Sequence, residues 1–260
     1  MTDTDTDTDT DTDTDTATRP DRVLVFAAHP DDIDFGAAAT VSSWTAAGVS
    51  VSYCILTDGD AGGFSDEDRP GVAALRRDEQ RAAAAIVGVS DVSFMGEPDG
   101  YLEPTDGVIR GIVRRMREIR PDIVLSMHPE RSWDRIQKSH PDHLACGEAV
   151  TRAVYPAVEN PFAYPELEAE GLRSHRVPWL WFYGGPAHLD NRFVDVTGRE
   201  DLKIEAITAH RSQHPDVDRM QSRVRSILTE NARRAGFPDG RSAESFHAVG
   251  VNTDRTIAGF

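Results

Sequence analysis

Two scarcities limit what this chain can be: it has few cysteines and no long apolar run. Only two cysteines, Cys54 and Cys146, occur in 260 residues, so no disulfide framework is available and a reducing compartment is expected. No apolar run approaches the ~20 residues that a membrane-spanning helix needs, and the polar N-terminus lacks the apolar core of a signal peptide. The sequence therefore predicts a cytoplasmic protein without a membrane span.

Basic residues are also in the minority. There are 28 lysines and arginines against 44 aspartates and glutamates, which gives a formal net charge of −16. Seven of the acidic residues lie in a Thr-Asp repeat over residues 2–15, and removing these seven charges from −16 leaves −9. This acidity argues against duplex DNA or other nucleic acid, and against an anionic membrane surface, as a partner.

The Thr-Asp repeat cannot bury a face, because short polar residues alternate with dense like charge. We expect residues 1–17 to form a disordered, solvated tail; weak, nonspecific attraction of cations is the functional alternative. No clean linker interrupts the remaining chain, so residues 18–260 are predicted to form a single domain, which is long enough to bury a full core. The sequence leaves open whether the protein is a monomer or a homo-oligomer.

From Arg22 onward, short apolar runs alternate with longer helical segments. Strands are expected at 23–28, 49–56, 92–95, 122–127, 179–183 and 193–196. Helices are expected at 36–48, 72–87, 108–119, 202–211 and 217–235. Regular alternation of this kind predicts right-handed strand–helix–strand units and a mainly parallel sheet, and hence an α/β fold.

Two short stretches share a pattern suited to a divalent metal: residues 29–32 read His-Pro-Asp-Asp and residues 140–143 read His-Pro-Asp-His. The first directly follows the strand expected at 23–28, and in open parallel sheets ligands bind beyond the carboxyl ends of the strands. The second is expected to open a helix, because proline favours the first helical position. His140 and His143 then lie on the same side of the first turn.

These stretches supply the side chains that metal-assisted amide hydrolysis needs. Two histidines and one carboxylate with an open fourth position are a recurring ligand set of catalytic zinc, and His29, Asp32 and His143 could provide it. The metal would lower the pKa of its water towards ~7 and polarise a substrate carbonyl. Asp31 is then a candidate general base, and His140 could stabilise an oxyanion or protonate a leaving amine.

Each piece also has a purely structural interpretation. A His-Pro-Asp stretch can simply start a helix, where the acidic residue interacts favourably with the helix dipole. We assign that role to the similar stretches at 128–130 and 214–216, although spacing alone does not exclude His214. Cys146 lies three residues beyond His143 and could reach a metal, but a small buried hydrophobe is the simpler interpretation.

The motifs at 28–32, Ala-His-Pro-Asp-Asp, and at 140–143 resemble those of the PIG-L/LmbE-like deacetylase family. The similarity runs from about Arg22 to the His-Arg-Ser-Gln stretch at 210–213, with Lys203 before it. Members of this family remove N-acetyl groups, typically from N-acetylglucosaminyl compounds, using zinc. The resemblance implies a Rossmann-like three-layer sandwich with a mainly parallel sheet.

Carried over residue by residue, the resemblance implies that His29, Asp32 and His143 bind zinc, although Fe²⁺ or Mn²⁺ could use the same ligands. It implies that Asp31 is the base and His140 the oxyanion stabiliser or acid.

The resemblance also places Arg76 and Asp99 at the substrate, which would be a small amino-sugar compound. Two departures from the family pattern bear on substrate preference: aspartate replaces the usual glutamate at Asp34, and alanines at 37–39 replace a common Gly-Gly.

Rival functions remain to be separated. An amidase that cleaves a larger acyl group, such as a thiol-conjugate amidase, would share the ligands and differ in the loops at 60–70 and 156–178. A metal- or sugar-binding protein without turnover would need no spare base, so Asp31 and His140 argue against it. A nucleotide-binding domain is disfavoured because the turn after the first strand lacks the glycines that let a pyrophosphate approach.

Overall fold

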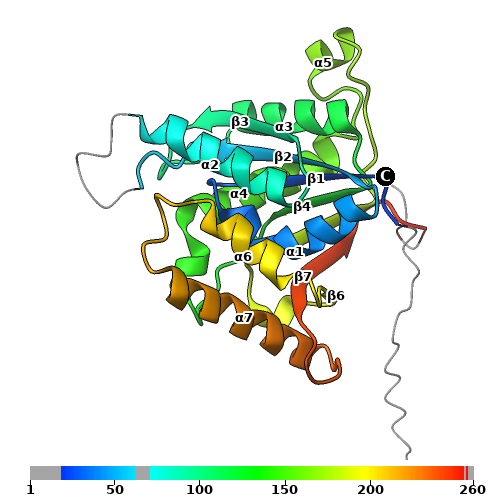
Figure 1. Ribbon diagram of the computed structural model, residues 1–260. Coiled ribbons are helices and arrows are strands. Elements are labelled where there is room, and N and C mark those ends of the chain that lie inside the picture. Colours follow the sequence, from blue (N-terminus) through cyan, green and yellow to red (C-terminus); the bar gives the residue numbers. More distant parts are fainter. Residues whose placement is uncertain (1–18, 63–70, 255, 257–260) are drawn as a thin grey trace, which may run out of the picture.

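The computed structural model describes residues 19–62, 71–254 and 256; the predicted tail at 1–17 and most of the loop at 60–70 lie outside them. The described strands form one sheet with helices on both faces (Figure 1). The strands are β1 (Arg22–Ala27), β2 (Ser50–Thr57), β3 (Asp91–Glu97), β4 (Ile123–Met127), β5 (Trp179–Tyr183), β6 (Arg192–Asp195) and β7 (Ala243–Gly250). Their order is β3-β2-β1-β4-β5-β7-β6. The predicted α/β fold, a Rossmann-like three-layer sandwich, is confirmed.

The first five strands run parallel, and β1 lies at their centre. Val23 pairs with Val51 of β2 on one side, and Val25 pairs with Leu125 of β4 on the other. From Val23 to the end of the strand, β1 is fully buried. Helices cover both faces of such a sheet, and for that reason its central strand is a continuous apolar run rather than an alternating one.

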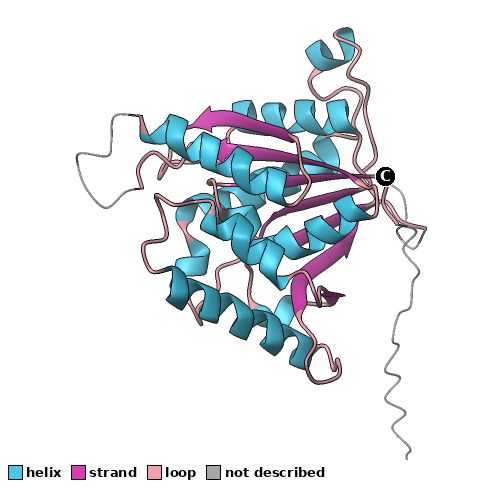
Figure 2. Cartoon of the chain, in the orientation of Figure 1, coloured by secondary structure: helices cyan, strands magenta, loops and turns pink. Residues whose placement is uncertain are grey.

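Helices form the two outer layers (Figures 1 and 2). They are α1 (Asp32–Ala46), α2 (Val72–Ile86), α3 (Asp106–Ile119), α4 (Pro141–Arg152), α5 (Pro165–Ala169), α6 (Glu200–Thr208) and α7 (Val217–Arg234). Helices α1, α2 and α6 pack together on one side of the sheet, and α3 and α4 on the other. Within the described ranges, no helix combines the length and apolarity needed to cross a bilayer.

The centre of the sheet is where the two predicted motifs meet. The chain leaves β1 towards one face and leaves β4 towards the other, which opens a crevice at the carboxyl ends of these two strands. A glycine allows α4 to close over it: a Cβ at Gly147 would lie 2.6 Å from the nitrogen of Pro129 and 2.7 Å from the carbonyl of Met127. The first turn of α4 is thereby held beside the end of β1.

The structure differs from the expected elements at two instructive places. Helix α1 begins at Asp32, four residues before the predicted start, because the left-handed backbone of Asp31 turns the chain directly into the helix. Strand β7 was not predicted. It runs antiparallel between β5 and β6, and its buried side chains include Glu244, which hides the apolar alternation that would reveal a strand.

Candidate metal centre and active site

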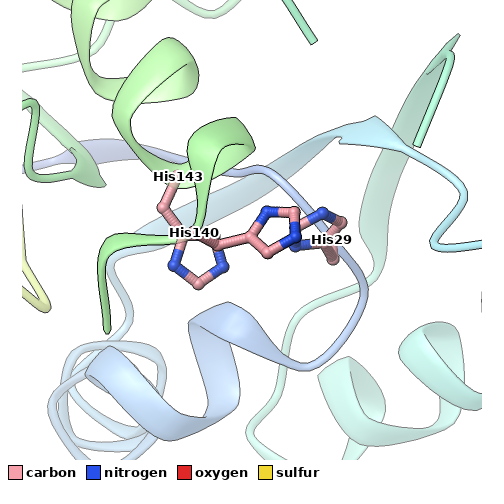
Figure 3. A group of neighbouring side chains, drawn as sticks. All are labelled: His29, His140 and His143. Atoms are coloured by element: carbon pink, nitrogen blue, oxygen red, sulfur yellow. The ribbon is translucent and has the colours of Figure 1, made fainter. Parts of the chain in front are cut away.

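Three histidines from the two motifs converge at the carboxyl end of β1 (Figure 3). His29 follows β1, His140 is the residue that caps α4, and His143 lies in the first turn of α4. One ring nitrogen from each lies within 4.8 Å of the others. The structure therefore brings together side chains that are more than one hundred residues apart in the sequence.

The carboxylate of Asp32 lies between two of these histidines. One oxygen is 3.4 Å from Nδ1 of His29, and the other is 3.1 Å from Nε2 of His143. Atoms bound tetrahedrally to one zinc at about 2.1 Å are roughly 3.4 Å from each other. Each of these two distances suits a pair of ligands on one metal, although they involve different oxygens of Asp32. Among the described residues, the groups whose ligand atoms all lie within 4.8 Å of one another are His29, His140 and His143, and His29, Asp99 and Asp142.

Hydrogen bonds on the far sides of two rings fix which nitrogen faces the centre. Nε2 of His29 is 3.2 Å from Asp142 and 3.1 Å from Asp99, so it donates to carboxylates. Nδ1 of His143 donates to the carbonyl of Lys138 at 3.1 Å. The other nitrogen of each ring contacts Asp32, and against the effect of burial the neighbouring carboxylates raise the pKa of both rings. A metal that displaced the proton from this nitrogen would take its lone pair.

His140 has the opposite arrangement. Its Nδ1 accepts a hydrogen bond of 3.2 Å from the backbone N–H of Asp142, so in the neutral ring the proton sits on Nε2. Burial and the neighbouring His29 lower the pKa of His140, which favours this neutral form. Its side chain is exposed and offers a hydrogen-bond donor beside the ligand atoms rather than a third imidazole lone pair.

The local charge also favours a cation. Burial acts to lower the pKa of His29, but hydrogen bonds to Asp142, Asp32 and Asp99 outweigh it and raise that pKa to about 12. Asp32 is largely withdrawn from solvent, which opposes ionisation, yet His143 and His29 hold its pKa well below the usual range. Three carboxylates around one imidazole form a site in which positive charge is strongly stabilised, and its donor set fits a divalent metal.

Asp31, the predicted base, has an unusual backbone. Its φ is 93°, in the left-handed region that favours glycine. Its backbone N–H donates to the side chain of Gln80 at 2.8 Å. One carboxylate oxygen of Asp31 is 3.5 Å from the guanidinium of Arg76 and 3.6 Å from Nε2 of His214, a histidine for which the sequence suggested only a structural role.

A buried chain of hydrogen bonds supports this conformation. The amide of Gln80 accepts from the backbone of Asp31 and donates to Asp34 at 2.9 Å, and Asp34 lies 2.8 Å from Nε2 of His210. Gln80, Asp34 and His210 have no solvent exposure. The aspartate that departs from the family pattern at position 34 thus takes part in holding the candidate base.

The two residues predicted to contact substrate lie at the centre, but each also contacts protein groups. Arg76 donates to the carbonyls of Gly59 at 2.6 Å and Pro30 at 2.8 Å. Asp99 accepts from the backbone of Ala61 at 2.7 Å with one oxygen, while the other oxygen lies 3.1 Å from His29. Their direct contact with a substrate stays a prediction.

Asp142 is the site residue whose contacts the sequence analysis missed. It is fully buried and accepts from the backbones of Gly100 at 2.7 Å and Leu102 at 3.2 Å while it contacts His29. The sequence feature that could have identified Asp142 is its position inside the motif at 140–143. Cys146, by contrast, is buried with its sulfur 3.9 Å from the hydroxyl of Ser126, which agrees with the role of a small hydrophobe.

The prediction that residues 128–130 start a helix is wrong, because they lie in the loop between β4 and η2 (Ile136–Ser139). His128 is nevertheless held by contacts within the protein. Its Nε2 lies 3.0 Å from Nδ1 of His247, and its Nδ1 accepts from the backbone of Glu130. Burial, with help from His247, lowers the pKa of His128 to about 4. Both ring nitrogens are therefore used within the protein.

Comparison with known proteins agrees with this geometry. Residues 24–154 match the PIG-L family model, described as GlcNAc-PI de-N-acetylase. The chain is 34% identical over 196 residues to diacetylchitobiose deacetylase of Thermococcus kodakarensis, covering 75% of this chain and 71% of that protein. It is 31% identical over 197 residues to a probable N-acetyl-alpha-D-glucosaminyl L-malate deacetylase 2 of Bacillus anthracis, covering 74% and 80%.

Comparison with a solved structure shows that the similarity includes the fold as well as the two motifs. N,N'-diacetylchitobiose deacetylase from Pyrococcus horikoshii superposes with a TM-score of 0.81 at 27% sequence identity, covering 89% of this chain and 84% of that one. The family match includes both motifs that build the centre described above. The chain therefore belongs to the PIG-L family, the family of GlcNAc-PI de-N-acetylase.

Proposed function

We propose that this protein is a zinc-dependent hydrolase that removes the N-acetyl group of a small molecule or glycoconjugate containing N-acetylglucosamine. One observation carries the proposal: Nδ1 of His29 and Nε2 of His143 both meet the carboxylate of Asp32, and His140 presents an N–H from the start of the same helix. The relatives named above, deacetylases of diacetylchitobiose and of an N-acetylglucosaminyl malate, support the choice of bond and of sugar.

His29, Asp32 and His143 would hold the metal. When bound there, a divalent ion supplies Lewis acidity that activates water and polarises the amide carbonyl. Asp31 would accept a proton from the attacking water, because it adjoins Asp32 in the chain and its carboxylate contacts Arg76 and His214 rather than the histidines that would hold the metal. His140 would stabilise the developing oxyanion through a hydrogen bond donated by its Nε2–H, and the proton that Asp31 accepts from the water would pass to the departing amine.

The remaining polar residues would order these groups. Asp142 and Asp99 keep the proton of His29 on Nε2, and Arg76 lies against the carboxylate of Asp31. Partners that orient a metal-binding histidine typically change metal affinity or activity 10–100-fold when removed. We propose that Arg76 and Asp99 contact the substrate in addition to ordering Asp31 and His29.

Acetate release tests the proposal directly. Purified protein should release acetate from at least one member of a panel of N-acetylglucosamine derivatives. The release should stop after chelation and return with added Zn²⁺, since the base and the acid alone do not polarise the amide. Fe²⁺ and Mn²⁺ are tested in parallel to identify the metal that supports the fastest turnover.

Other outcomes of the same assay would replace the proposal. Turnover confined to substrates with longer N-acyl groups would indicate an amidase for a larger acyl group. Metal-dependent binding of an amino sugar without any release would indicate a binding protein. Chelation without any effect on the rate would refute the role of the metal.

A further expected result concerns Gln80. Gln80→Leu should lower kcat by roughly 10- to 100-fold, because it removes the acceptor of the Asp31 backbone N–H and small displacements of a catalytic group are costly. Bound metal and KM should stay near their wild-type values, since Gln80 contacts none of the ligands. Steady-state kinetics and metal analysis measure all three quantities.

Gln221→Leu on α7 is the matched control and should leave kcat unchanged. If Gln80→Leu lowers only the melting temperature and not kcat, Gln80 is a structural residue and does not position the base.

A further inference from the structure

A cavity of about 580 Å³ opens directly beside the metal centre. Asp32 and His143 form part of its wall, and the first turn of α1, η2 (Ile136–Ser139) and one face of α7 form most of the rest. An acetyl group would fill only a small part of this space, since cavities of ~300–1,000 Å³ accommodate drug-sized ligands. The remainder must receive the part of the substrate that stays attached to the amine.

The lining of this cavity is rich in positive charge. Its basic residues are Arg135, Lys138, Lys203, Arg223 and Arg234. Two of them have acidic partners in the same wall: Lys203 lies 2.6 Å from Glu244, and Arg234 lies 2.9 Å from Asp190.

The other three basic side chains have no carboxylate partner. Within the described ranges, the side chains of Arg135, Lys138 and Arg223 make no ion pair and no hydrogen bond. They are also close enough to affect one another: burial lowers the pKa of Lys138, and the charges of Arg135, Arg234 and Arg223 lower it further against the opposing effect of Asp190. Like charges gathered in this way are stabilised when an anion enters between them.

This concentration is unusual for the molecule. The chain carries a formal charge of −16, and the metal centre beside the cavity contributes the carboxylate of Asp32 to its wall. Arginine in particular binds carboxylate and phosphate through a planar pair of N–H groups.

We propose that the cavity between η2 and α7 binds a negatively charged group, a carboxylate or a phosphate, on the aglycone of the substrate, through Arg135, Lys138 and Arg223. The proposal rests on the deacetylase function proposed above and adds the substrate class. An N-acetylglucosamine derivative with an acidic aglycone would present its acetamide to the metal centre and its anion to these three side chains.

Two substrates of nearly the same shape but different charge test the proposal. The carboxymethyl glycoside of N-acetylglucosamine and its carboxamide differ in charge but hardly in size. The wild-type protein should have a higher kcat/KM for the acid. Arg135→Gln and Arg223→Gln should each reduce the acid-to-amide ratio of kcat/KM about tenfold, because each removes a hydrogen bond to a charged group whose strength is partly screened by solvent.

Arg219→Gln is the control, because it removes the same charge from α7 outside the cavity and should keep the wild-type ratio. The preference should also fall as salt is added. N-acetylglucosamine 1-phosphate, compared with methyl N-acetylglucosaminide, extends the test to phosphate.

The two proposals fail in different ways. Equal turnover of acid and amide, unchanged in both variants, would overturn the anion site and leave the deacetylase intact. If no substrate is hydrolysed, the dissociation constants of the acid and the amide for the Asp31→Asn protein decide the question. Tighter binding of the acid that is lost in Arg223→Gln would support the anion site, and equal binding would refute it.

Discussion

Asp31→Asn should lose most of its activity, with kcat reduced by ~10²–10⁴-fold, the range typical of a general base. The substitution removes the proton acceptor but keeps the size of the side chain. Asparagine also tolerates the left-handed backbone found at this position, so the fold and the metal centre should be retained. Kinetics of acetate release, with metal content measured on the same protein, test the expectation.

The matched control is Asp78→Asn, which changes an exposed aspartate on α2 that pairs with Arg81. It should turn over at the wild-type rate. Normal turnover by Asp31→Asn would show that another group accepts the proton, and His214, 3.6 Å from Asp31, would be the next candidate. Loss of metal from Asp31→Asn would instead make this residue a ligand.

The second large effect is a contrast between two histidines in one turn of α4. His143→Ala should lose both the bound metal and the activity, because Nε2 of His143 contacts Asp32 and would give its lone pair to the metal. Its metal affinity should fall by more than the roughly 10–100-fold typical of losing an outer partner. His140→Ala should keep the metal and lose kcat, because His140 presents an N–H. Metal analysis of the dialysed variants separates the two roles.

His188→Ala, an exposed histidine outside the centre, serves as the control and should keep both properties. Full metal content in His143→Ala would remove it from the ligand set. Loss of metal from His140→Ala would mean that the ring turns over and binds the ion, against the hydrogen bond to its Nδ1.

Much of the fold follows from local pattern. The parallel strands are continuous apolar runs separated by helical segments, and each helix of the first half was located from its periodicity and its glycine or proline boundaries. Strand β7 could not be located in this way. Its pairing with β5 and β6 depends on distant residues, and the buried pair of Glu244 with Lys203 interrupts the apolar pattern with charge.

The candidate site, like the fold, could be predicted only where local sequence determines it. His29, Asp32, His140 and His143 were predicted because proline and the strand end place them locally. Which nitrogen each ring directs inward depends on partners far away in the sequence, such as Asp99, which is 70 residues from His29. The support of Asp31 by Gln80 is likewise a contact between elements, and no spacing rule predicts it.

The backbone of Asp31 has one more consequence. A non-glycine residue with positive φ costs of order 1–3 kcal/mol, and at φ 93° Asp31 lies farther from the ordinary left-handed well than Arg120 or Tyr164, which have φ of 55°. Glycine would relieve that cost but would remove the candidate base. Selection for heat resistance and selection for turnover therefore act in opposite directions at this position, and a more durable enzyme should be sought through changes elsewhere in the chain.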